Sequence, residues 1–173
     1  VYKRQFINCM HLALKVCIST VICNFLVSPL SASAGSWTDV DALRARLEQN
    51  GVRVTQGDCQ RGLQGAYDSR RDVLIVCRAH RGPVDVWNTL AHEAAHRMQD
   101  CAGGPISRRE HMQSMVNSLR RYSPQDIASL RAYPRSQHRA EIEARYTAKL
   151  PPQQVMHLFD RYCGRNGRGR YQA

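Results

Sequence analysis

The sequence contains no C-x-x-C pair, no internal repeat and no run of basic residues interleaved with aromatic residues. The first absence argues against a four-cysteine zinc site, which is usually built from such pairs. The absence of repeats, together with a length of 173 residues, favours one domain. The third absence argues against a specific nucleic-acid partner, because single-strand binders combine basic grooves with aromatic stacking platforms.

Lysine is almost missing, and Lys149 is the only one after residue 34. The chain nevertheless has 25 basic against 14 acidic residues, because arginine is abundant, and its formal charge is +11. Without residues 1–34 the charge is still +8. Such a surface favours contact with an anionic surface, either an acidic polymer or a membrane, although a solvated arginine-rich surface has the same composition.

No hydrophobic run is long enough to span a bilayer comfortably. The longest apolar stretch, residues 16–27, follows Lys3 and Arg4 and precedes the small-residue sequence Ala32-Ser33-Ala34. This order predicts a secretory signal peptide over residues 1–34, cleaved after Ala34, with an uncleaved anchor as the alternative. We therefore expect a secreted or periplasmic protein that has no stable membrane span after signal cleavage.

Four cysteines follow the predicted leader: Cys59, Cys77, Cys101 and Cys163. An even number in an exported chain predicts two disulfides, with three pairings open. The favoured pairing is Cys59–Cys77, which would brace the strand region, with Cys101–Cys163, which would join the ends of two helices.

The periodicity of the remaining sequence predicts an α+β domain over residues 35–163, with a small antiparallel sheet followed by a bundle of helices. Residues 164–173 contain no aliphatic side chain larger than that of alanine and are predicted to be a disordered basic tail. Residues 63–68 and 72–78 should form an antiparallel hairpin, with the second strand central. Thr38 and Asp41 are expected to cap the first helix. Helices are expected at 37–50, 83–100, 107–122, 123–133, 136–150 and 153–162, with a further strand at 52–56.

The sequence His92-Glu93-Ala94-Ala95-His96 has the H-E-x-x-H spacing. Two histidines four residues apart on a helix project from the same face and can reach one metal ion. Glu93 is rotated away from the ion, where it can act as the base for a water molecule. The alternative interpretation is an ordinary polar helix face, which would be costly in a core without partners.

A zinc site of this kind needs a third protein ligand. The short H-x-x-G-x-x-H continuation is absent, which argues against a metzincin. Glu141 and Glu143 lie on one predicted helix but point about 160° apart, so at most one of them should face the metal. The downstream candidates are Glu110, His111, His138, Glu141, Glu143 and His157.

The segment 89–96, preceded by an apolar hairpin strand, resembles the gluzincin metallopeptidases and is similar to the compact ImmA/IrrE-type bacterial peptidases, which implies a zincin-like fold. In gluzincins the third ligand is a glutamate on a later helix, in a pattern near E-x-x-A-[D/N]. Residues 141–144 match its first four positions, so the resemblance implies Glu141 as the ligand. Arg145 departs from the pattern at the position that usually orients a ligand histidine. Glu143 is the alternative ligand, followed by Glu110 or His111.

The sequence therefore predicts an exported metallopeptidase that binds one Zn²⁺ per chain and hydrolyses peptide or protein substrates. His92, His96 and Glu141 would hold the ion, and Glu93 would be the catalytic base. Tyr133, Tyr146 and His138 are the candidate donors to the oxyanion. Two alternatives stay open: a hydrolase acting on cell-wall peptide crosslinks, and a non-catalytic basic secreted binding protein for an acidic polymer or a membrane surface.

Overall fold

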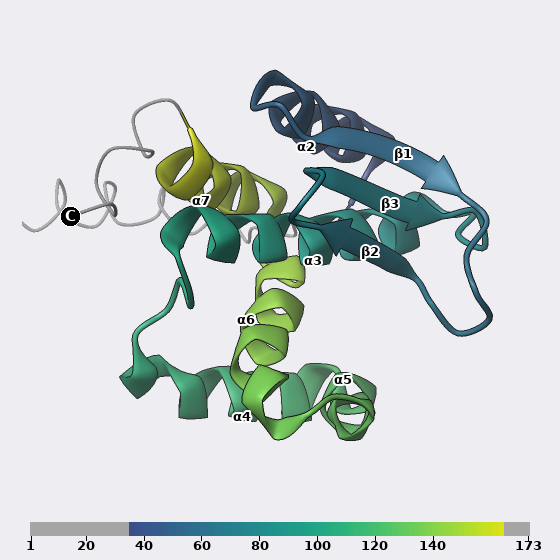
Figure 1. Ribbon diagram of the computed structural model, residues 1–173. Coiled ribbons are helices and arrows are strands. Elements are labelled where there is room, and N and C mark those ends of the chain that lie inside the picture. Colours follow the sequence, from purple (N-terminus) through teal and green to yellow (C-terminus); the bar gives the residue numbers. More distant parts are fainter. Residues whose placement is uncertain (1–34, 165–173) are drawn as a thin grey trace, which may run out of the picture. The chain divides into compact units, whose positions relative to one another are not determined.

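The computed structural model describes residues 35–164, which fold as an α+β unit (Figure 1). The described part contains a three-stranded mixed sheet and six α-helices. The predicted signal peptide, residues 1–34, and residues 165–173 of the predicted tail lie outside the described residues.

The first helix, α2 (Trp37–Gln49), begins as expected but uses a different cap. Thr38 and Asp41 were the wrong pair: Ser36 accepts a hydrogen bond from the Asp39 amide, and the Asp39 carboxylate accepts one from the Ser36 amide. The sequence offers the same spacing twice, two residues apart, so spacing alone did not distinguish them. Val40, Leu43 and Leu47 form the buried face of the helix.

The sheet consists of β1 (Arg53–Gly57), β2 (Gly65–Asp68) and β3 (Val73–Cys77) in the order β1-β3-β2. The predicted β2–β3 hairpin and the central position of β3 are confirmed. The prediction of a purely antiparallel sheet is wrong, because β1 pairs with β3 in parallel. The chain leaves β1, enters the far edge as β2 and turns back as β3, so β3 runs in the direction of β1.

Helix α3 (Pro83–Ala102) carries the H-E-x-x-H sequence and lies at the centre of the described unit. It starts with a proline, which suits the first helical turn, and ends at Gly103 in the left-handed conformation. It packs against α2, α6 and α7 and against strands β2 and β3. Trp87, Leu90 and Met98 are fully buried on it, and the small side chains of Ala94 and Ala95 let neighbouring elements approach closely.

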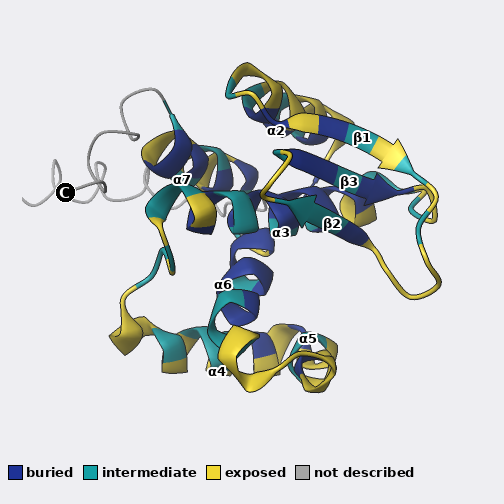
Figure 2. Cartoon of the chain, viewed as in Figure 1, coloured by how far each residue is buried: buried dark blue, intermediate teal, exposed yellow. Residues whose placement is uncertain are grey.

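A short helical region follows α3 and packs on α6. It contains the 3-10 turn η1 (Arg109–His111), α4 (Met112–Tyr122), α5 (Pro124–Ala128) and the turns η2 (Ser129–Ala132) and η3 (Arg135–Gln137). Leu119, Leu130 and Ile142 form a second small core between this region and α6. Figure 2 shows that the outward side of α4 and α5 is largely exposed.

The last two helices are α6 (His138–Ala148) and α7 (Pro152–Cys163). The predicted disulfide pairing is confirmed: Cys59–Cys77 joins the region after β1 to β3, and Cys101–Cys163 joins the end of α3 to the end of α7. Two disulfides favour an oxidising compartment. Within residues 35–164, none of the helices has the length and apolar character needed to cross a bilayer.

Candidate metal centre

His92 and His96 lie one turn apart on α3, with their rings facing each other edge to face. The ring centroids are 4.8 Å apart and the planes are inclined by 82°. The two Nε2 atoms are 3.1 Å apart. This approach follows from the four-residue spacing on a regular helix, which places both side chains over the same face.

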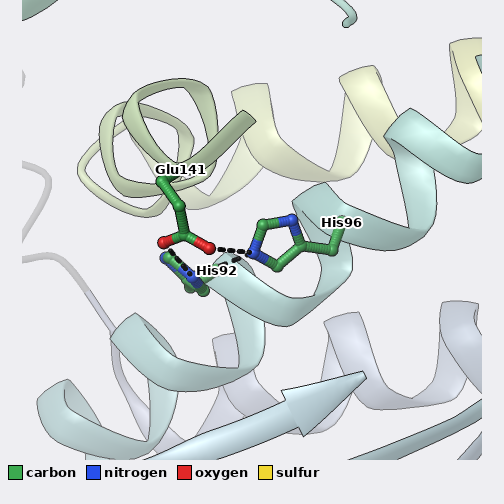
Figure 3. Close-up of side chains that lie close together, drawn as sticks. All are labelled: His92, His96 and Glu141. Atoms are coloured by element: carbon green, nitrogen blue, oxygen red, sulfur yellow. Dashed lines mark hydrogen bonds and ion pairs between the residues drawn. The ribbon is translucent and has the colours of Figure 1, made fainter. Parts of the chain in front are cut away.

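Glu141 reaches the same point from α6, the helix that packs along α3 (Figure 3). Its Oε1 atom lies 3.4 Å from Nε2 of His96, and its Oε2 atom lies 3.7 Å from Nε2 of His92. The three residues form the group that offers close metal-ligating atoms among the described residues. The structure thus brings together the three residues that the sequence singled out as ligands.

Gln99 determines which nitrogen of His96 faces the group. Its Nε2 atom donates to the carbonyl of Ala140 and to the Glu143 carboxylate, both of which only accept. The amide oxygen of Gln99 must therefore be the atom that lies 2.9 Å from Nδ1 of His96. Since that oxygen only accepts, Nδ1 carries a proton, and Nε2 is the nitrogen that can bind a cation.

Glu143, the alternative ligand, lies on another side of α6 and is not a member of the group. Its side chain is 1% exposed. It accepts hydrogen bonds from Gln99, from the backbone amides of Ile106 and Ser107, and from the Ser107 hydroxyl. Glu143 thus connects α6 to the segment that follows α3, and it also holds the Gln99 side chain in place.

The other candidate ligands lie elsewhere. Glu110 and His111 are exposed in η1, where their side chains approach each other at 3.8 Å. His138 Nε2 contacts the Tyr133 carbonyl at 3.0 Å, and His157 is exposed on α7.

Arg145 lies four residues after Glu141, one turn further along α6. Its Nη2 atom donates to Oε2 of Glu141 at 3.3 Å, and its Nη1 atom donates to the Asp126 carbonyl and the Ser129 hydroxyl. In this chain the residue four positions after Glu141 therefore orients the carboxylate itself. The residue that orients His96 is Gln99, three residues further along α3.

Burial and mutual charge set the protonation of the three clustered side chains. Burial and the neighbouring His96 lower the pKa of His92 to about 4. Burial opposes protonation of His96 too, but hydrogen bonds with Glu141 and Gln99 outweigh it and raise the pKa of His96. Burial acts to raise the pKa of Glu141, and His96, His92 and Arg145 together reverse that effect and lower it. The cluster therefore favours protonation of His96 over protonation of His92, and it favours the ionised form of Glu141.

Glu93 is buried beside this group, and burial raises the pKa of its carboxyl to about 7. The backbone of Tyr67 in β2 lies close enough to the carboxylate to counteract part of that rise. Gly65 permits this approach of β2 to α3, because a Cβ there would lie 2.4 Å from Cγ2 of Thr89. Strand β2 therefore supports Glu93 from the sheet side.

A cleft of about 480 Å³ opens next to the group, and both His92 and Glu93 line it. Its other walls come from residues 62–65, from His80 and the first half of α3, from the α5–η2 region, and from the second half of α6 with Lys149. Of the three candidate oxyanion donors, Tyr133 lines the cleft, where the guanidinium of Arg145 lies over its ring at 5.3 Å. Tyr146 packs against the second core instead.

Three roles were missed by sequence reasoning: those of Gln99, Gly65 and Arg145. The spacing of Gln99 from His96 was a usable signal, because residues three apart on a helix are neighbours. The contact of Gly65 with α3 is tertiary and left no sequence pattern.

No model of a protein family matches this chain, and no curated protein or solved structure does.

Proposed function

We propose that this protein is a zinc-dependent peptidase in which His92, His96 and Glu141 hold one Zn²⁺ and Glu93 is the catalytic base. The observation that carries the proposal is the spacing of the donor atoms. Zinc binds histidine nitrogen and carboxylate oxygen at about 2.0–2.2 Å in tetrahedral geometry, which separates neighbouring donors by about 3.3 Å. The two histidine Nε2 atoms are 3.1 Å apart, which is close to that spacing. Glu141 places Oε1 at 3.4 Å from His96 and Oε2 at 3.7 Å from His92, and one donor atom from each of the three residues lies within 4.8 Å of the other two.

The type of donor also favours zinc. Two imidazole nitrogens and one carboxylate suit zinc far better than calcium or magnesium, which prefer oxygen ligands. Gln99 keeps Nδ1 of His96 protonated, so Nε2 is available to the ion. Since His92 lines the cleft, the group has a side that a water molecule or substrate can reach.

When bound, zinc supplies a Lewis acid that polarises a carbonyl group and lowers the pKa of water to about 7. The chain itself supplies the proton transfers. Glu93 lines the cleft one residue after His92, and its carboxylate would take a proton from the attacking water and deliver it to the leaving amine. The Tyr133 hydroxyl is the candidate donor to the developing oxyanion.

The cleft supports a peptide or protein substrate. Its volume of about 480 Å³ accommodates a few side chains of an extended segment.

The two disulfides favour action in an oxidising compartment, so we propose that the enzyme is secreted or periplasmic. A hydrolase of cell-wall peptide crosslinks would use the same site. Release of amines from wall material without cleavage of casein would favour that substrate.

The test is the metal content of the purified protein by elemental analysis. We expect one zinc per chain in the wild type and in Glu110→Ala, whose exposed carboxylate lies outside the group. Glu141→Ala should lose the metal, since it removes the only carboxylate of the group. Absence of stoichiometric zinc from the wild type after reloading would contradict the proposal. The non-catalytic basic binding protein would then be the better interpretation.

A further inference from the structure

The net positive charge of the described chain is confined to one region. We define the basic lobe as residues 107–139, from η1 to the first turn of α6. It holds seven arginines and two acidic residues. The rest of the described chain, residues 35–106 and 140–164, holds twelve basic and twelve acidic residues and has no formal net charge. The arginines of the lobe are Arg108, Arg109, Arg120, Arg121, Arg131, Arg135 and Arg139.

Most arginines of the basic lobe have no acidic partner. Within residues 35–164, ion pairs join Arg108 to Glu110 and Arg139 to Glu143. The other five lobe arginines are exposed and form no ion pair with any described residue. Outside the lobe, seven of the twelve basic residues form ion pairs with acidic side chains. The distribution of acidic residues therefore neutralises the rest of the described chain but not the lobe.

Unpaired like charges on a small lobe repel one another within the screening distance of about 8–10 Å. The anionic groups of a partner would attract these arginines and offset the repulsion among them. The lobe also contains arginine and no lysine. The planar guanidinium matches phosphate and carboxylate oxygens with two parallel hydrogen bonds, which an ammonium group does not.

The structure argues against a membrane as the partner. Helix α4 is amphipathic, but Met112, Met115, Val116 and Leu119 face the second core. A helix that lies in a membrane interface needs such an apolar face outward. The outward side of α4 instead carries Gln113, Asn117, Arg120 and Arg121, and Figure 2 shows it as exposed.

The spread of the arginines argues against a small anion. They occur just before and on η1, on α4, η2 and η3, and at the start of α6. Helix α4 alone, with eleven residues, is about 16 Å long. We propose that the basic lobe is a docking surface for an extended linear polyanion. The lobe also contributes Asp126, Ser129 and Tyr133 to the wall of the cleft, so a docked polymer would be held beside it. This inference needs neither the metal nor catalysis and stands apart from the proposed function.

The test measures binding of long-chain polyphosphate to the full chain over a range of salt concentrations. The lobe variant is Arg120→Gln with Arg131→Gln. The matched control is Arg53→Gln with Arg70→Gln, which removes two exposed arginines outside the lobe. Both variants lose the same charge and keep residues 165–173 intact. All four side chains are exposed, so both proteins should fold, which thermal unfolding checks.

We expect the lobe variant to bind about tenfold more weakly at 0.1 M salt. The slope of log affinity against log salt should fall by about 1.4, since each lost contact with a flexible polyanion contributes roughly 0.7. The control should change affinity less than about twofold. Equal weakening of both variants, or no binding by the wild type, would overturn the inference. Binding to anionic phosphatidylglycerol vesicles without binding to polyphosphate would overturn it in favour of a membrane.

Discussion

The Nδ1 atom of His96 lies 2.9 Å from the side-chain oxygen of Gln99, and the orientation of that amide is fixed by Glu143 and the Ala140 carbonyl. A buried residue that does not line the cleft thus decides which nitrogen of a candidate ligand faces the group. Hydrogen-bond partners of this kind typically change metal affinity 10–100-fold when they are lost. Gln99 is therefore a positioning residue in the proposed site.

Gln99→Met should lower zinc affinity by about 10–100-fold, because it removes the acceptor for Nδ1 while nearly preserving side-chain volume. Competition with a chromophoric chelator measures the affinity. Gln113→Met on the exposed side of α4 is the control and should leave affinity unchanged. Unchanged affinity in a folded Gln99→Met protein would show that Gln99 supports packing alone.

Glu93→Gln should abolish peptide hydrolysis and leave the zinc content unchanged. The amide preserves the size of the side chain but cannot take up a proton at neutral pH. Peptide cleavage and elemental analysis on the same preparation provide both readouts. Full activity in this variant would rule out the proposed role of Glu93.

Zinc uptake should release a proton near neutral pH. In the absence of metal, hydrogen bonds with Glu141 and Gln99 hold the pKa of His96 above its ordinary value of 6.5. Zinc must displace that proton, so affinity should rise with pH throughout the range below the raised pKa of His96 and level off above it. Calorimetry in buffers of different ionisation enthalpy counts the released protons. Affinity that does not vary between pH 6 and pH 8 would contradict this expectation.

Gly65→Ala should destabilise the fold by about 1–3 kcal/mol, the usual cost of overpacking. The added Cβ would lie 2.4 Å from Cγ2 of Thr89 and 2.9 Å from the Ile75 carbonyl oxygen. Strand β2 would have to move away from α3, which would also weaken the contact between Tyr67 and Glu93. Gly82→Ala, whose Cβ would meet nothing closer than 3.9 Å, is the control for thermal unfolding.

Removal of Cys101–Cys163 should cost more stability than removal of Cys59–Cys77. The bridges close loops of 62 and 18 residues, and loop entropy gives about 4 and 3 kcal/mol respectively. Paired cysteine-to-serine variants compared by chemical denaturation test this order. Since Cys101 ends the helix that carries His96, the first variant should also bind zinc less tightly. Equal losses would show that loop length does not govern these two bridges.

Local patterns predicted much of this structure. Helix α3, the central strand β3 and the division of Glu141 and Glu143 onto different sides of α6 followed from spacing and periodicity. The disulfide pairing was the favoured one of three that the sequence left open. The direction of β1 did not, because a short alternating strand looks the same in parallel and antiparallel pairs. The hydrogen bonds of Gln99 and the packing of Gly65 against α3 join residues up to 44 positions apart in the sequence. Periodicity reports only on near neighbours, so it did not predict these contacts.

Lys149 lines the cleft near Asn88 and Asp126, and it is the single lysine of residues 35–173. Amine-directed reagents therefore have one side-chain target in that part of the chain, and it lies on the wall of the cleft. The rate of acylation at this amine would report occupancy of the cleft directly. Protection of Lys149 from acylation would identify a ligand without a catalytic assay.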